Sequence, residues 1–121
     1  MPSLPLDDEN LPLFTVGQVS QMLEIQQAFL RRLDQLRVVQ PTRSAGGQRR
    51  YTRREITVVQ YVTNLVDEGM TLKAIRRVLE LESRVRELEY QVRELEAHRD
   101  AAVAERDALV ARLSPKPERP T

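Results

Sequence analysis

The sequence predicts a mainly α protein: a small helical domain with a short β-hairpin, followed by one long helix that pairs with a second copy. Three observations support this prediction. Only five of the 121 residues are aromatic, so a core must be built from Leu, Val and Ile, which favours helices over a β-sandwich. Two Thr-x-x-Gln/Glu capping boxes precede amphipathic segments, and apolar heptads cover residues 78–113.

Composition and periodicity divide the chain into four segments. Residues 1–13 contain three prolines and three acids without periodicity, so we expect a disordered N-terminal arm. Residues 14–77 carry the patterns of a compact domain, and residues 78–113 carry the heptads of a dimerisation helix. Residues 114–121 are expected to form a disordered tail.

The first two helices are predicted to be short and joined by a tight turn. Thr15-Val-Gly-Gln18 is a capping box, and apolar residues continue on one face to Leu23, which predicts a helix of about eight residues. A second helix follows Ile25, with Phe29, Leu30, Leu33 and Leu36 on its inner face and Gln26, Gln27, Arg31 and Arg32 on its outer face. Two short helices, the second polar and cationic outside, are typical of a helix-turn-helix.

A hairpin is predicted to follow the second helix. The short β-branched stretch Val38–Pro41 precedes the turn residues Arg43–Gly47, and Gln48–Tyr51 continues in extended register. Glycines at the tip allow the backbone to approach a surface closely. A plain connecting hairpin is the alternative, but five arginines flank this tip: Arg43, Arg49, Arg50, Arg53 and Arg54. The basic hairpin therefore predicts the wing of a winged helix-turn-helix domain.

The rest of the domain is predicted to be helical. Thr52-Arg-Arg-Glu55 is the second capping box, and it precedes an amphipathic helix that stops at Gly69. The inner residues of this helix are Ile56, Val59, Val62, Leu65 and Val66. Thr71 is expected to cap the next helix, whose Leu72, Ile75 and Leu79 close the core.

From Val78 the apolar pattern changes to heptads. Position a holds Val78, Val85, Val92, Arg99, Arg106 and Leu113, and position d holds Leu81, Leu88, Leu95, Ala102 and Leu109. At 1.5 Å per residue this helix is about 50 Å long, too long for a small domain to cover its apolar stripe. We therefore expect a coiled-coil homodimer, with a bent helix folded onto its own domain as the alternative. The expected dimerisation residues are Val85, Leu88, Val92, Leu95, Ala102 and Leu109.

The arginines at the seam predict the orientation of the two helices. Parallel pairing stacks Arg99 on Arg99 and Arg106 on Arg106, whereas antiparallel pairing separates them and places Val85 opposite Leu109. The exposed ion pair that parallel pairing gains is worth at most about 1 kcal/mol. We expect an antiparallel dimer; a parallel dimer and a monomer are the alternatives.

One segment is strongly basic although the formal net charge is only +1. Residues 25–54 contain eight arginines, no lysine and a single acid, Asp34, for a net charge of +7. The fixed charge and planar fork of arginine suit phosphates and guanine edges, so double-stranded DNA is the expected partner. A solvated charged face is the alternative. The candidate DNA contacts are Gln26, Gln27, Arg31, Arg32, Arg43, Gly47, Arg49, Arg50 and Arg53.

The sequence offers no group of residues suited to catalysis, a metal or a cofactor. There is no cysteine, and the only histidine, His98, lies among the heptads. Apolar runs are far shorter than the roughly 20 residues that span a bilayer, so a cytoplasmic location is expected. The expected function is sequence-specific DNA binding by a transcription regulator that is not an enzyme. The alternative is an architectural protein that binds DNA with little sequence choice.

Residues 14–82 resemble the MerR family of bacterial transcription regulators. The resemblance lies in Phe14-Thr-Val-Gly-Gln-Val19, in Leu30-Arg31 with Asp34, in Arg43-Ser-Ala-Gly-Gly-Gln-Arg-Arg-Tyr51 and in Asp67-Glu-Gly-Met-Thr-Leu-Lys-Ala-Ile-Arg76. Within the family, the Gly-Gly-x-Arg-Arg-Tyr wing is similar to that of the HspR-type heat-shock repressors. The family usually has glycine where this chain has Arg37, and threonine where it has Phe29.

The resemblance implies a division of roles on DNA. The second helix would enter the major groove and the wing would contact the DNA backbone, which assigns contacts to Gln26, Gln27, Arg31, Arg43, Arg49, Arg50 and Tyr51. It also implies that the protein is a repressor and that it is located in the bacterial cytoplasm, on the nucleoid. The cysteines and large C-terminal domain of the sensing members have no counterpart here, so no small-molecule effector is expected. A protein partner, either a chaperone or the transcription machinery, is not identified by these residues.

Overall fold

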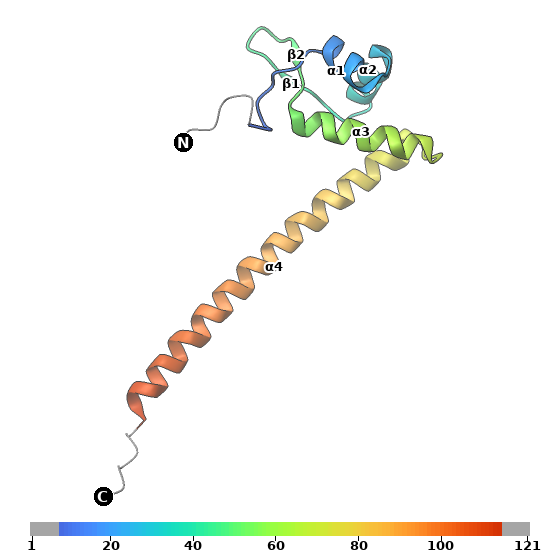
Figure 1. Ribbon diagram of the computed structural model, residues 1–121. Helices are drawn as coiled ribbons and strands as arrows, with labels where there is room; N and C mark the ends of the chain where they lie inside the picture. Colours follow the sequence, from blue (N-terminus) through green and yellow to red (C-terminus); the bar gives the residue numbers. More distant parts are fainter. Residues whose placement is uncertain (1–7, 115–121) are drawn as a thin grey trace, which may run out of the picture. The chain divides into compact units, whose positions relative to one another are not determined.

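The computed structural model describes residues 8–114, which form four helices and one antiparallel hairpin (Figure 1). The elements are α1 (Val16–Leu23), α2 (Gln27–Gln35), β1 (Thr42–Arg43), β2 (Arg49–Arg50), α3 (Arg53–Asp67) and α4 (Leu72–Leu113). The outer parts of the expected arm and tail, residues 1–7 and 115–121, lie outside the described residues. Contacts divide the chain into two units, with the boundary between Glu80 and Leu81, inside α4. The mainly α fold with a β-hairpin is confirmed.

Threonine side chains begin three of the helices, as the sequence predicts. Thr15 Oγ1 accepts a hydrogen bond from the Gln18 amide, and the Thr15 amide donates to Gln18 Oε1 in return. Thr52 and Glu55 form the same reciprocal pair at the start of α3. Thr71 Oγ1 accepts from Ala74 at 3.1 Å and caps α4. These bonds satisfy amides that a helix start leaves without a partner.

Three helices end in the same way, with a residue in the left-handed region. This residue is Glu24 after α1 (φ 55°), Arg37 after α2 (φ 57°) and Gly69 after α3 (φ 96°). In each case its amide donates to the carbonyl three residues back, and the next amide donates to the carbonyl five residues back. This is the hydrogen-bond pattern of a Schellman motif, which satisfies the last carbonyls of a helix.

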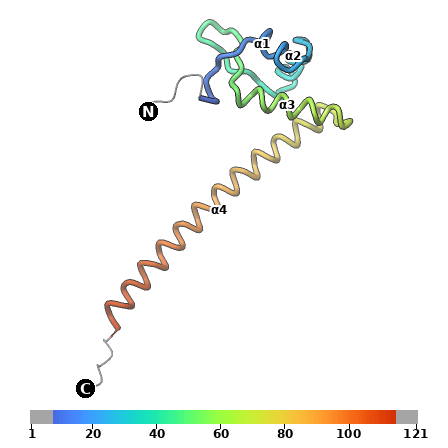
Figure 2. Tube along the Cα trace, viewed as in Figure 1, coloured from blue at the N-terminus to red at the C-terminus, as the bar shows by residue number. Residues whose placement is uncertain are grey.

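The residue after each left-handed position is apolar. Ile25, Val38 and Met70 are half-buried and pack against the core. An apolar contact at this position commonly accompanies a Schellman motif. Each helix end therefore anchors the next segment, which allows the short connections from α1 to α2 and from α3 to α4 (Figure 2).

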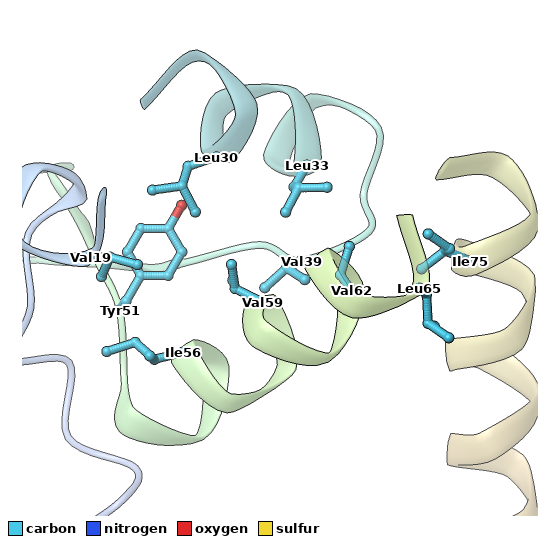
Figure 3. Close-up of a cluster of buried hydrophobic side chains, with 10 residues drawn as sticks. All are labelled: Val19, Leu30, Leu33, Val39, Tyr51, Ile56, Val59, Val62, Leu65 and Ile75. Carbon is cyan, nitrogen blue, oxygen red and sulfur yellow. The ribbon is translucent and has the colours of Figure 1, made fainter. Parts of the chain in front are cut away.

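The core lies mainly between α2 and α3. Figure 3 shows Leu30 and Leu33 of α2 pointing toward Val59 and Val62 of α3, with Tyr51 and Val39 beside them. The remaining buried apolar residues are Val19, Ile56, Leu65 and Ile75. Leu36, expected on the inner face of α2, is instead its C-cap and is 41% exposed, because the helix ends before it.

The hairpin begins later than the sequence predicts. The stretch Val38–Pro41 was expected to form its first strand, but β1 is Thr42–Arg43, paired with Arg50 and Arg49. Val38 and Val39 are held by bonds from their amides to the Leu33 carbonyl, which continue the end of α2. The side chain of Val39 is buried, so its apolar character serves the core and not a strand.

Residues 8–14 join the domain through backbone hydrogen bonds. The amide of Arg54 donates to the Glu9 carbonyl at 3.1 Å. Phe14 and Tyr51 form an isolated antiparallel bridge, with amide-to-carbonyl distances of 3.1 and 2.7 Å. This bridge ties the start of α1 to the end of β2.

From Leu81 onward α4 is a single helix without a break, as the heptads predict. In the single chain every residue from Ser83 to Ser114 is exposed, and this includes the large apolar side chains of the heptads. No helix in the described part of the chain has the length and apolar character that a membrane span requires.

Replacing Gly69 with alanine is expected to destabilise the N-terminal domain by about 1 kcal/mol, because a Cβ atom is strained at φ 96°. Denaturant unfolding of Gly69→Ala measures this loss. Gly46→Ala is the matched control, since its Cβ would meet only Ser44 Oγ at 4.0 Å and no left-handed φ is required. Equal stability of the two variants would contradict the role of Gly69.

Candidate nucleic-acid interface

The outer face of α2 is exposed and polar. Gln27, Arg31 and Arg32 are all exposed, and neither arginine forms an ion pair within residues 8–114. Gln26 was expected on this helical face, but it is the N-cap residue, with extended backbone (φ −77°, ψ 143°) and no capping bond from its side chain. It is exposed directly before the helix.

The wing is a two-residue ladder closed by a tight turn. Thr42 pairs with Arg50 and Arg43 with Arg49. In the turn, the Gly47 amide donates to the Ser44 carbonyl at 2.9 Å, and the Gln48 amide donates to Ser44 Oγ at 3.1 Å. Gly47 has φ 79°, a conformation that glycine adopts without strain. The predicted contacts Arg43, Gly47, Arg49 and Arg50 are therefore brought together.

A buried carboxylate joins the wing to α2. Asp34 is 8% exposed, and its Oδ2 atom accepts from Arg49 Nε at 2.7 Å and from Arg43 Nη2 at 3.4 Å. Arg49 is the more buried of the two arginines. One carboxylate of α2 thus binds one arginine from each strand, which sets where the hairpin lies beside the helix.

This role of Asp34 was not predicted from the sequence, where the residue counted as the single acid of the basic segment and as part of the family resemblance. The signal was its spacing, because Asp34 lies four residues after Leu30 and one after Leu33, on the inner face of the helix. A lone acid on a buried face requires a cationic or hydrogen-bonding partner. Its partners come from another part of the chain, so spacing alone does not name them.

Tyr51 is buried in the core of the domain. The resemblance assigns it a DNA contact, but the residue is only 1% exposed and packs with Leu30 and Val59 (Figure 3). Burial raises the pKa of its phenol above the usual value, and the negative charge of Asp34 raises this pKa further. Tyr51 therefore anchors the end of β2 to the hydrophobic core.

A basic concavity lies between the wing and the start of α1. Its volume is about 420 Å³, and it is lined by Thr15, Val16, Gly17, Arg43, Gly47, Gln48, Arg49 and Arg50. Gln27 is a neighbour, because a Cβ built on Gly17 would lie 3.6 Å from Gln27 Nε2. The contribution of residues 15–17 and of Gln48 to this concavity was not predicted from the sequence. Arg53, the first residue of α3, does not line this concavity.

The expected dimerisation residues form an exposed stripe on α4. Val85, Leu88, Val92, Leu95 and Leu109 are 44–68% exposed in the single chain, and Ala102 is exposed as well. A shallow groove of about 380 Å³ follows this stripe, lined by Val85, Leu88, Glu89, Val92 and Arg93. Among the described residues, no three His, Cys, Asp or Glu side chains are grouped so that they could hold a metal ion.

Residues 14–82 match the family model of the MerR HTH family of regulatory proteins. The chain belongs to the MerR family. The match covers both helices of the helix-turn-helix, the wing, α3 and the first part of α4.

Two curated relatives are similar to this MerR-family chain. A protein proposed to be the heat shock protein HspR of Streptomyces coelicolor is 37% identical over 76 residues, which is 62% of this chain and 50% of that protein. The HTH-type transcriptional regulator GlnR of Bacillus anthracis is 26% identical over 73 residues, 60% of this chain and 57% of that protein. The chain thus spans about half the length of the curated relatives it matches.

Two solved structures share the fold. HiNmlR, a MerR family regulator lacking the sensor domain and bound to promoter DNA, superposes with a TM-score of 0.54 at 23% identity, over 83% of this chain and 86% of that one. The N-terminal part of MtaN, the Bacillus subtilis multidrug transporter activator, superposes with a TM-score of 0.53 at 17% identity, over 84% and 99%.

Removing the carboxylate of Asp34 is expected to destabilise the domain more than removing its exposed partner. Asp34→Ala should lower the free energy of unfolding by about 2 kcal/mol, because it removes a charged hydrogen bond at 2.7 Å and leaves Arg49 partly buried. Arg43→Ala should cost less than about 1 kcal/mol, since Arg43 is half-exposed and its contact is longer. Chemical denaturation measures both, and equal losses would contradict this ranking.

Proposed function

We propose that this protein is a sequence-specific DNA-binding transcription regulator that acts as a homodimer, and that it represses. The observation that carries the proposal is the basic concavity beside the exposed outer face of α2, since it presents a cationic surface and a polar helix together. Membership of the MerR family supports the proposal. So does the shared fold with HiNmlR, whose structure holds promoter DNA.

The wing supplies most of the affinity in this proposal. Arg43, Arg49 and Arg50 lie around one concavity, and the Nη atoms of Arg49 form no hydrogen bond within residues 8–114. Phosphate contacts from arginines release counterions and bind any DNA sequence. They fix the register and orientation of a protein on the duplex without distinguishing bases.

The outer face of α2 supplies base discrimination. Gln27 and Arg31 are four residues apart on one face of the helix, and both are exposed. Glutamine matches the edge of adenine in the major groove and arginine matches that of guanine. Gln26, the N-cap residue of α2, is proposed to read bases together with Gln27 and Arg31. Arg32 and Arg53 are proposed to add phosphate contacts.

The seam of α4 is proposed to pair two copies in antiparallel orientation. Large apolar side chains that are half-exposed along several turns need a partner surface. Antiparallel pairing places Val85 opposite Leu109 and Val92 opposite Ala102, and keeps Arg99 and Arg106 of one chain away from the same residues of the other. The stems of these arginines then cover leucines.

The repressor role rests on the resemblance of the wing to that of the HspR-type heat-shock repressors, and the similarity to the HspR relative of Streptomyces coelicolor supports that resemblance. We propose that the protein acts on the chromosome in the cytoplasm, without a small-molecule effector. The alternative function is that of an architectural protein. It is favoured only by the number of arginines in the wing that are proposed to contact phosphates, because such contacts do not depend on DNA sequence.

A competition experiment separates the regulator from the architectural protein. Genomic fragments are mixed with the protein and an excess of random competitor DNA, and the retained fragments are footprinted. If the protein is a sequence-specific regulator, it should retain one class of genomic fragment, and in a gel-shift assay it should bind this fragment but not a scrambled version of it. An architectural protein shifts both alike, and that result would overturn the proposal.

Arg50→Ala is expected to weaken binding to all duplexes to a similar degree and to reduce the slope of log affinity against log salt by about one per protomer. Arg50 is preferred to Arg49 because Arg49 also binds Asp34. Fluorescence anisotropy over a salt series measures the slope. Arg86→Ala, an exposed change on α4, is the matched control. If Arg50→Ala leaves the salt slope unchanged, the assignment of the wing to the DNA interface is contradicted.

Cysteine cross-linking tests the antiparallel pair, and the absence of native cysteine makes the result unambiguous. Leu81→Cys and Leu113→Cys chains, mixed and oxidised, should form a disulfide with each other, because these positions face one another only in antiparallel register. Each variant alone should cross-link poorly. Efficient linkage between two Leu113→Cys chains would establish parallel pairing.

A further inference from the structure

The shallow groove on the first half of the α4 stripe combines apolar side chains with an acidic margin. It is lined by Val85, Leu88, Glu89, Val92 and Arg93, and its volume is about 380 Å³. Glu89 lies four residues after Val85 and therefore beside it on the helix surface. Glu89 is exposed and forms no ion pair within residues 8–114. The groove thus suits a segment that carries apolar side chains together with a cation.

The second half of the same helix carries such a segment. Val103 and Val110 follow Glu89 by two and three heptads, so valine replaces glutamate along this edge, and the two side chains are 40% and 55% exposed. Arg106 lies on the same edge, four residues before Val110. Its guanidinium contacts the adjacent Asp107 at 3.2 Å, but these side chains are 70% and 63% exposed, and such a pair contributes little.

Antiparallel pairing brings the acidic margin and this segment to the same level. In the register that places Val85 opposite Leu109, Glu89 of one chain is one residue away from the level of Arg106 of the other, which is about 1.5 Å along the helix axis. The two-fold axis of such a pair also brings each edge of the helix against the same edge of its partner. Glu89 and Arg106 therefore lie on one side of the seam, within reach of each other.

We propose that the groove binds residues 102–110 of a second copy, and that an ion pair between Glu89 of one chain and Arg106 of the other fixes the orientation and register of the dimer. The two-fold axis repeats this ion pair, so each dimer contains two. Beside an apolar seam the pair is less screened by water than the exposed pair that Arg106 forms within its own chain. The proposal rests on the proposed homodimer and adds the residues by which α4 selects a second copy over other coiled-coil helices.

A charge exchange between two variants tests this ion pair. Glu89→Arg and Arg106→Glu each place like charges at both contacts of their own homodimer, whereas a heterodimer of the two variants has opposite charges at both. If each contact changes affinity about 2- to 5-fold, an equimolar mixture should contain at least about 80% heterodimer, against about half without a preference. Native mass spectrometry of the mixed whole chains measures this fraction, because the two variants differ in mass. A general loss of folding cannot produce such a rescue.

Glu94→Arg mixed with Arg106→Glu is the matched control, since Glu94 is exposed at position c, away from the seam, and does not line the groove. This mixture should show no preference for the heterodimer. If Glu89→Arg pairs with Arg106→Glu no better than the control does, the ion pair is overturned while the homodimer stands. A heterodimer preference between Glu89→Arg and Arg84→Glu instead would overturn it in favour of parallel pairing, which brings residues 84 and 89 together. If the native chain is monomeric in the same measurement, the proposed homodimer fails and the ion pair fails with it.

Discussion

The ion pair between Asp34 and Arg49 determines where the wing lies. A ladder of two residue pairs is too short to hold a hairpin in place, because an isolated two-stranded hairpin is at best marginally stable in water. The hairpin is also crowded with arginines that repel one another. One buried carboxylate at 2.7 Å from Arg49 Nε offsets this repulsion and ties both strands to α2. The basic concavity and its relation to the outer face of α2 follow from that attachment.

Locally encoded features were predicted well from the sequence. The capping boxes at Thr15 and Thr52 fixed the starts of two helices, and the stop at Gly69 agrees with its left-handed backbone. Each of these signals depends on residues within one turn of one another, so the sequence contains all the partners. The mainly helical fold and the hairpin follow from such signals.

Features set by distant partners were predicted poorly. The resemblance assigned Tyr51 a DNA contact, yet its side chain is 1% exposed and lies in the core. Asp34 was not assigned because its arginines lie 9 and 15 residues away along the chain. Val38 and Val39 have the composition of a strand but complete the end of α2. In each case tertiary packing decides between roles that local composition leaves equal.

Arg37 combines a left-handed helix end with a charged side chain that has no ion-pair partner within residues 8–114. A residue other than glycine at φ 57° costs about 1 kcal/mol or more, yet the side chain here is a fully ionised guanidinium, exposed to solvent. It forms no ion pair within residues 8–114, so it strengthens no contact of the folded domain. Its charge instead adds to the long-range field of the basic segment. Such a field increases the rate at which the domain associates with a polyanionic partner. The strained backbone at Arg37 lowers the folding stability of the domain, and the higher association rate accompanies this loss.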